Sequence, residues 1–139
     1  MNTKKFSILL AALMLVLVQL ACAAGEPALS NTRTARDQDG AQQTSTFGAF
    51  DTVYVVSDLA NGAAGNIITS KWYAENVNGL DPNFLLDEAD ITVTEQDAPF
   101  NGTIYFYFEP PSDGWAAGTY AIEIYFNGAL SATVKFTVQ

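Results

Sequence analysis

The feature that most constrains the fold is an alternation of apolar and polar residues, which begins near Phe47 and continues to the end of the chain. A period of two is typical of β-strands, because successive side chains of a strand point to opposite faces of a sheet. Tyr120, Ile122 and Ile124, for example, fall on one face of a single segment. The alternation predicts strands over residues 53–56, 67–73, 90–95, 103–108, 120–126 and 132–138.

Turn-forming residues separate these segments. Asn127-Gly128 stands between the last two segments and predicts a tight hairpin, because both residue types tolerate positive φ. Prolines and glycines near residues 97–102 and 109–114 mark further breaks. Residues 80–86 fit either a short helical turn or a loop. We therefore expect an all-β fold, an antiparallel sandwich of about 6–7 strands.

The apolar face of each predicted strand should point into the space between two sheets. The predicted core residues are Val53, Val55, Ile68, Trp72, Ile91, Val93, Ile104, Phe106, Phe108, Tyr120, Ile122, Ile124, Val134 and Phe136.

The C-terminal part also carries a recognisable pattern. The segment from Trp115 to Gly128 reads WAAGTYAIEIYFNG, and the chain closes on Phe136-Thr-Val138. This resembles the last hairpin of bacterial extracytoplasmic immunoglobulin-like modules, and the Trp72-Tyr73 pair and Phe108-Glu-Pro-Pro111 fit the same pattern. The resemblance covers residues 47–139 and implies an immunoglobulin-like sandwich. Such modules are attached to lipoproteins and membrane proteins, so the resemblance implies a location and a fold but no activity.

The N-terminus has the layout of an export signal. Lys4 and Lys5 precede the apolar run Phe6–Leu20, and small residues follow up to Ala24. A positive start, an apolar middle and a small-residue end are typical of a signal peptide, here over residues 1–24. An uncleaved membrane anchor is the alternative, although the run is short of the roughly 20 residues that span a bilayer.

Cys22 decides how such a signal is processed. Leu20-Ala21-Cys22 resembles a bacterial lipoprotein signal, in which the cysteine is lipidated and becomes the new N-terminus. Gln19 stands where an aliphatic residue is usual, so cleavage after Ala23 or Ala24 and free secretion remain open. We expect either a membrane-anchored lipoprotein or a secreted protein.

Residues 25–46 are polar and show no periodicity. Because so little apolar surface cannot offset the entropy of ordering the segment, we expect a disordered linker that holds the domain away from the membrane. A chain of 139 residues otherwise leaves room for one small domain.

The excess of acidic residues limits which partners the protein can bind. The chain has 15 acidic residues, and four of its six basic residues remain once Lys4 and Lys5 are removed. A phosphate backbone would repel such a domain, so we expect no nucleic-acid partner and no membrane contact beyond the N-terminal anchor.

Catalytic chemistry has few candidate groups. The chain has no histidine, and its single cysteine lies in the signal region. Serine–lysine chemistry would need Lys71 or Lys135, both expected to face water, and paired-carboxylate glycoside hydrolysis would need a larger cleft. We therefore expect a protein that is not an enzyme and has no cofactor.

Four acidic residues between positions 81 and 90 could in principle bind calcium, namely Asp81, Asp87, Glu88 and Asp90. They lack the glycine spacing of a calcium loop, so we interpret them as a solvated acidic loop and predict no metal site.

Tyrosines supply the candidate binding residues. Tyr105 and Tyr107 should point away from the core on one strand, and Tyr125 should do so on the next. If these strands are antiparallel neighbours, the three rings form an exposed stripe that could bind a protein or a sugar. Cross-strand packing that only stabilises the sheet is the alternative. The sequence thus predicts an immunoglobulin-like binding or structural module with an unidentified protein or carbohydrate ligand.

Overall fold

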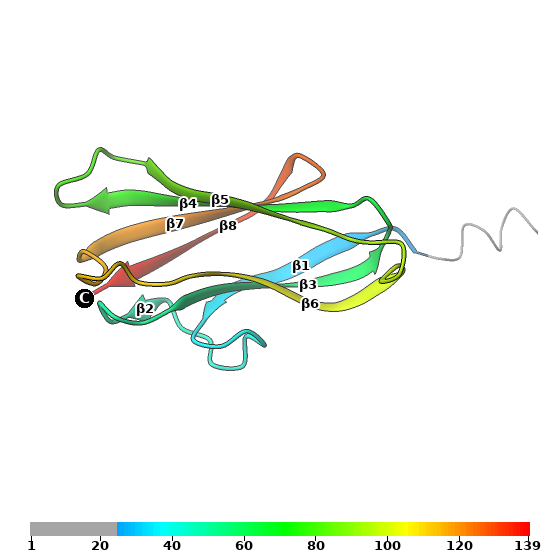
Figure 1. Ribbon diagram of the computed structural model, residues 1–139, viewed down its shortest axis with the longest axis horizontal. Coiled ribbons are helices and arrows are strands. Elements are labelled where there is room, and N and C mark those ends of the chain that lie inside the picture. Colours follow the sequence, from blue (N-terminus) through cyan, green and yellow to red (C-terminus); the bar gives the residue numbers. More distant parts are fainter. Residues whose placement is uncertain (1–24) are drawn as a thin grey trace, which may run out of the picture.

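Residues 25–139, which the computed structural model describes, form two β-sheets packed face to face (Figure 1). Their eight strands are β1 (Ala28–Ala35), β2 (Thr46–Phe47), β3 (Val53–Gly62), β4 (Ile67–Val77), β5 (Phe84–Thr92), β6 (Phe100–Phe108), β7 (Gly118–Phe126) and β8 (Ala129–Val138). One sheet has the order β1-β3-β6, and the other has the order β2-β8-β7-β4-β5. The expected all-β sandwich is confirmed, with β2 and β8 as the parallel pair among antiparallel ones.

The six predicted strands all correspond to observed ones, but their bounds differ. β5 ends at Thr92, whereas the alternation predicted a strand over 90–95. Phe84 already belongs to β5, so residues 80–86 are a turn followed by a strand and contain no helix. The hairpin at Asn127-Gly128 is confirmed: φ is 49° and 83° at these residues, and Phe126 pairs with Ala129 on either side of the turn.

The expected disordered linker over residues 25–46 is wrong. Residues 28–35 form β1, which runs antiparallel to β3 along the edge of the smaller sheet. Thr34 and Ala35 are buried. The chain then turns back, and Thr44 N donates to Thr34 O at 3.1 Å before β2 begins.

The physical reason lies in contacts with residues far along the chain. Arg33 pairs with Asp58 at 3.4 Å, and Asn31 Nδ2 donates to Asp58 Oδ2 at 2.9 Å. The hydrogen bond from Asn31 and the charge of Arg33 both lower the pKa of Asp58. Because an edge strand gains its backbone hydrogen bonds from its neighbour, a polar sequence can be ordered without a large apolar face.

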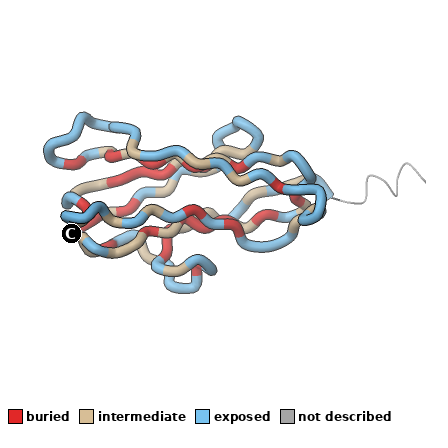
Figure 2. The backbone as a smooth tube through the Cα atoms, in the orientation of Figure 1, coloured by how far each residue is buried: buried red, intermediate tan, exposed pale blue. Residues whose placement is uncertain are grey.

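The core lies between the sheets, where the buried parts of both layers face each other (Figure 2). Most of the predicted core residues are buried; Ile91, Phe108 and Val134 are half-buried and pack against the rest. Phe136 and Tyr120 stack at 5.0 Å between ring centroids, and Trp72 lies on Phe108 at 5.6 Å. The core also includes residues that the prediction missed, among them Phe47, Leu59 and Trp115.

Two further contacts match immunoglobulin sandwiches. Trp72 is a buried tryptophan on β4, which has a neighbouring strand on each side, and Tyr120 Oη donates to Ala116 O at 2.6 Å near the start of β7. Such a tyrosine corner fastens the preceding loop to the strand. Trp115 connects the same loop to the segment between β2 and β3, because its Nε1 donates a hydrogen bond to Asp51 O at 2.9 Å.

The predicted signal peptide and Cys22 lie outside the described residues. Within residues 25–139 no helix has the length and apolar character to cross a membrane.

Candidate functional site

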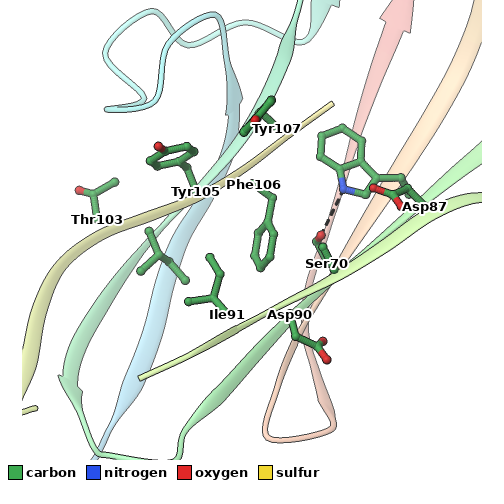
Figure 3. A pocket seen from close by; sticks show the side chains of 11 residues that line it. Ser70, Asp87, Asp90, Ile91, Thr103, Tyr105, Phe106 and Tyr107 are labelled. Atoms are coloured by element: carbon green, nitrogen blue, oxygen red, sulfur yellow. Dashed lines mark hydrogen bonds between the residues drawn. The ribbon is translucent and has the colours of Figure 1, made fainter. Parts of the chain in front are cut away.

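A cleft of about 460 Å³ opens on one side of the sandwich, between β5 and β6 (Figure 3). Each of these strands is the last in its sheet, and the two are not hydrogen-bonded to each other. On the opposite side the chain itself links the layers, because β1 belongs to one sheet and β2, which follows after residues 36–45, belongs to the other. The sandwich is therefore open along one side and bridged along the other.

The interior of the cleft is mainly apolar. Ile91 from β5 and Ile104 and Phe106 from β6 line it, and Ser70 and Trp72 from β4 form its floor. Figure 3 shows Ile91 and Phe106 in the space between the two strands. Trp72 Nε1 donates to Ser70 Oγ at 3.2 Å, so the polar atoms of the floor satisfy each other and leave an apolar surface for a ligand.

Two carboxylates, Asp87 and Asp90, border the cleft, and one of them lies on the inner face of its strand. Asp87 lies opposite Trp72 in the pairing of β4 with β5, and Trp72 faces the core. Asp87 therefore lies on the inner face of β5 with Ala89 and Ile91, which are its alternate neighbours. It stays exposed at the mouth of the cleft, and none of the ion pairs among residues 25–139 involves it.

The acidic segment is not a loop, contrary to the sequence interpretation. Asp87, Glu88 and Asp90 all lie on β5, and Asp81 lies in the preceding turn. Asp90 accepts a hydrogen bond from Thr69 Oγ1 at 2.6 Å on the outer face of the sheet. Strand geometry sends Asp87 to the inner face and Glu88 and Asp90 to the outer face, so the carboxylates do not converge. Within residues 25–139 no group of three or more His, Cys, Asp or Glu residues is placed to hold a metal ion.

Tyr105 and Tyr107 point outward from β6, as the alternation predicts, with 38% and 54% of their surfaces exposed. Both also border the cleft. The ring that joins them is Tyr54 of β3, which lies 6.0 Å from Tyr105 and 5.9 Å from Tyr107 between centroids. We call these three residues the tyrosine cluster. The alternation in Val53-Tyr54-Val55 was the signal that could have identified Tyr54.

Tyr125 does not join this cluster, so the predicted stripe is wrong. β6 and β7 are consecutive in sequence but belong to different sheets, and Tyr125 is therefore on the opposite sheet from Tyr105. Its hydroxyl donates to Glu123 Oε2 at 2.5 Å, and this hydrogen bond is the main cause that raises the pKa of Tyr125 to about 12. Lys71 Nζ lies 4.9 Å from the centroid of the same ring.

Both lysines within residues 25–139 interact with another side chain. Lys71 lies over Tyr125, and Lys135 forms an ion pair with Glu75. Neither lysine lines the cleft, and neither donates a hydrogen bond to a serine among the described contacts. Among the described residues the cleft thus holds an apolar surface, one inner carboxylate and a tyrosine rim, which is an arrangement suited to binding.

Solved structures share this fold at low sequence identity. An immunoglobulin-like protein from Pseudomonas aeruginosa is 14% identical, with a TM-score of 0.55, and the match covers 84% of this chain and 99% of that one. The fold is immunoglobulin-like. No protein-family model matches the sequence, and neither does any curated protein.

Two larger proteins contain a similar fold over part of their length. The alkylpurine DNA glycosylase AlkC of Pseudomonas fluorescens is 8% identical, with a TM-score of 0.51, over 83% of this chain and 31% of that one. A β-glucosidase from Erythrobacter marinus is 12% identical, with a TM-score of 0.51, over 82% of this chain and 15% of that one. The chain spans less than a third of either enzyme, so these likenesses concern the fold alone.

Proposed function

We propose that this protein is an extracytoplasmic immunoglobulin-like binding module that holds a partner protein in the cleft between β5 and β6. The cleft itself carries the proposal. It is an apolar opening of about 460 Å³ with an exposed tyrosine rim, and its size is in the range of ligand sites in proteins. Buried apolar surface and tyrosines at the rim are the features that supply most of the binding free energy at protein interfaces.

The tyrosine cluster favours a protein partner over a carbohydrate. Sugar rings stack on aromatic faces, and a flat platform requires aromatic planes that are nearly parallel. The planes of Tyr54 and Tyr105 are tilted by 56°, and those of Tyr54 and Tyr107 by 34°. Tilted, exposed rings beside an apolar cleft are better suited to irregular side chains than to a flat sugar chain.

The proposed role is binding and not catalysis. Within residues 25–139 there is no histidine or cysteine to act as a base or nucleophile, and both lysines contact an acid or an aromatic ring. The strong excess of acidic residues supports the further expectation that nucleic acid is not the partner.

The proposal places the module at a membrane surface through Cys22. Only five residues, 23–27, separate Cys22 from the start of β1. At about 3.5 Å for each extended residue, they reach less than about 20 Å. A lipidated Cys22 would therefore hold the domain close to the membrane, and not at the end of the longer linker that composition suggested. The C-terminal end, at the far end of the sandwich in Figure 1, would point away.

Retention of a ligand by cleft variants tests the proposal. Mature protein, the Ala89→Arg variant and a Tyr105→Ala, Tyr107→Ala double variant are immobilised and exposed to the extracytoplasmic fraction of the producing cell. Leu130→Ala is the matched control, because Leu130 is an apolar side chain, 56% exposed, on β8.

We expect wild-type protein and Leu130→Ala to retain the same partner and both cleft variants to lose it while remaining folded. Equal retention by all four proteins would contradict the proposal. A double variant that unfolds would indicate that the tyrosines are structural, and Ala89→Arg then decides whether the cleft binds.

A further inference from the structure

We propose that the segment bound in the cleft is an extended strand rich in lysine or arginine, which adds to the free edge of β5 and lengthens the five-stranded sheet. This inference rests on the proposed function and names the chemistry of its ligand. Three observations carry it: a free strand edge on each side of the cleft, the alternation of side chains along β5, and the charge of that strand.

The backbone of β5 is hydrogen-bonded on one side only. β5 pairs with β4 along its length and is the last strand of its sheet, just as β6 is the last strand of the other. The outer backbone N–H and C=O groups of an edge strand can pair with an added strand, and this pairing is a recurring mode of peptide recognition. A strand placed on β5 would also cover the open side of the sandwich.

The side chains of such a strand would meet two different surfaces, because successive side chains of a strand point to opposite faces. Those on the inner face would lie beside Ala89 and Ile91 of β5 and opposite Phe106 of β6. Those on the outer face would lie beside Glu88 and Asp90. An alternating sequence of apolar and basic residues matches these two faces.

The charge of β5 selects a basic strand. Asp87, Glu88 and Asp90 lie on its nine residues, and it carries no basic residue. The edge of β6 has no charged residue, because its sequence is FNGTIYFYF, so charge complementarity points to β5. A second copy of this chain is a poor occupant, since two β5 edges would bring their carboxylates together.

Among residues 25–139, no basic residue forms an ion pair with β5. Lys71 lies opposite Glu88 in the pairing of β4 with β5, but its Nζ is placed over the ring of Tyr125. Arg33, Arg36 and Lys135 form ion pairs with Asp58, Asp51 and Glu75, none of which is on β5. Charges on an edge strand can also serve only to prevent aggregation. That role predicts weak pairing with every strand, whereas our proposal predicts pairing with basic strands in particular.

Synthetic strands test the inference by NMR on isotope-labelled mature protein. The probes are a nine-residue peptide of alternating lysine and valine with blocked ends, the same peptide with glutamate in place of lysine, and the lysine peptide with alternate backbone nitrogens methylated along one edge. Cellohexaose serves as a carbohydrate probe. We expect the lysine peptide to shift the β5 amide signals and the Trp72 indole signal and to slow hydrogen exchange along β5.

The controls separate charge from backbone pairing. We expect the glutamate peptide and the methylated peptide to bind at least about tenfold more weakly than the lysine peptide, a factor that corresponds to about 1.4 kcal/mol. A Glu88→Gln, Asp90→Asn variant, which removes the charge of the outer face, should lose a similar factor, and added salt should weaken the wild-type complex. Leu130→Ala should bind as wild type does.

Absence of β5 shifts with the lysine peptide, equal binding of the lysine and glutamate peptides, or binding of cellohexaose in the cleft would each overturn the inference. The inference and the proposed function fail separately. If the cleft variants lose their natural partner but the lysine peptide does not bind, the proposed function stands and the inference fails, because the cleft is then a protein site that does not take a basic strand. If the cleft variants keep their partner, the site lies elsewhere.

Discussion

At the scale of single residues, Tyr120 joins a loop to the core through one hydroxyl group. The ring is buried against Phe136, and the hydroxyl donates to Ala116 O at 2.6 Å. Tyr120→Phe removes the donor and leaves a carbonyl without its partner. We expect a loss of about 1–2 kcal/mol in the free energy of unfolding, measured with urea.

Tyr54→Phe is the matched control for Tyr120→Phe, because no hydrogen bond from the Tyr54 hydroxyl occurs among the described contacts. We expect almost no change in its unfolding free energy. An equal loss of unfolding free energy in both variants would show that the hydrogen bond from Tyr120 to Ala116 O does not itself stabilise the fold.

The Glu123 carboxylate controls the ionisation of Tyr125. The hydrogen bond to Glu123, followed by burial and by the charge of Glu123, raises the pKa of Tyr125 from 10.0 to about 12. A raised folded-state pKa favours the neutral phenol, so this contribution to stability is complete below pH 10 and is lost as the pH rises through 12. We expect Glu123→Gln to bring the pKa of Tyr125 back toward 10, measured by NMR titration of labelled tyrosines. An unaltered pKa of Tyr125 in this variant would refute the assigned cause.

The tyrosines show what can be predicted for single residues and what cannot. The alternation placed Tyr105 and Tyr107 outward on β6 because a strand repeats every two residues. Their neighbour depends on which strands pair, and the sequence interpretation chose Tyr125, whereas the structure places Tyr54 there. The inner position of Asp87 depends in the same way on its register with Trp72, which no local pattern contains.

At the scale of elements, β1 is the strand that the composition of the chain did not predict. Its sequence, ALSNTRTA, has few apolar residues, and its stability comes from pairing with β3 and from the ion pair of Arg33 with Asp58. Arg36, the residue directly after β1, forms a second ion pair, with Asp51. Strands with a long apolar alternation, such as β7, were predictable because one face is buried.

Removal of β1 should destabilise the protein severely. A fragment that starts at residue 46 lacks β1 and leaves β3 as a free edge. We expect its melting temperature to fall by more than about 10 °C, since a loss of 1 kcal/mol lowers the melting temperature of a domain of this size by about 4–8 °C.

The control for this truncation is a fragment that starts at residue 25, and circular dichroism measures both. If the shorter fragment melts at the same temperature, β1 is dispensable and the polar segment behaves as the linker that composition suggests.

At the scale of the whole molecule, the assignment of strands to the two sheets could not be predicted from the sequence. β6 and β7 were treated as antiparallel neighbours, but nine residues, 109–117, connect them and carry the chain to the other sheet. Tight hairpins use two to five residues, so the length of this connection was the available signal. The cleft could not be predicted either, because it exists only between the free edges of two sheets.

The proposed location at a membrane surface depends on lipidation of Cys22. If the cysteine is lipidated, Cys22→Ser should move the protein from the membrane fraction to the soluble extracytoplasmic fraction. The intact mass of wild-type protein from membranes should then include the acyl chains, because several chains anchor a protein stably. An unmodified Cys22 would refute the lipoprotein interpretation and leave secretion or an uncleaved anchor.

The claim that the cleft is the binding site is tested most directly by photo-crosslinking in intact producing cells. A benzoylphenylalanine at position 107 lies on the rim of the cleft, and one at position 130 lies on β8, which is separated from β5 by β7 and β4. Our account predicts one discrete protein adduct from position 107, its loss when Ala89→Arg fills the cleft, and no such adduct from position 130. The same adduct from both positions, or an adduct that survives Ala89→Arg, would contradict it.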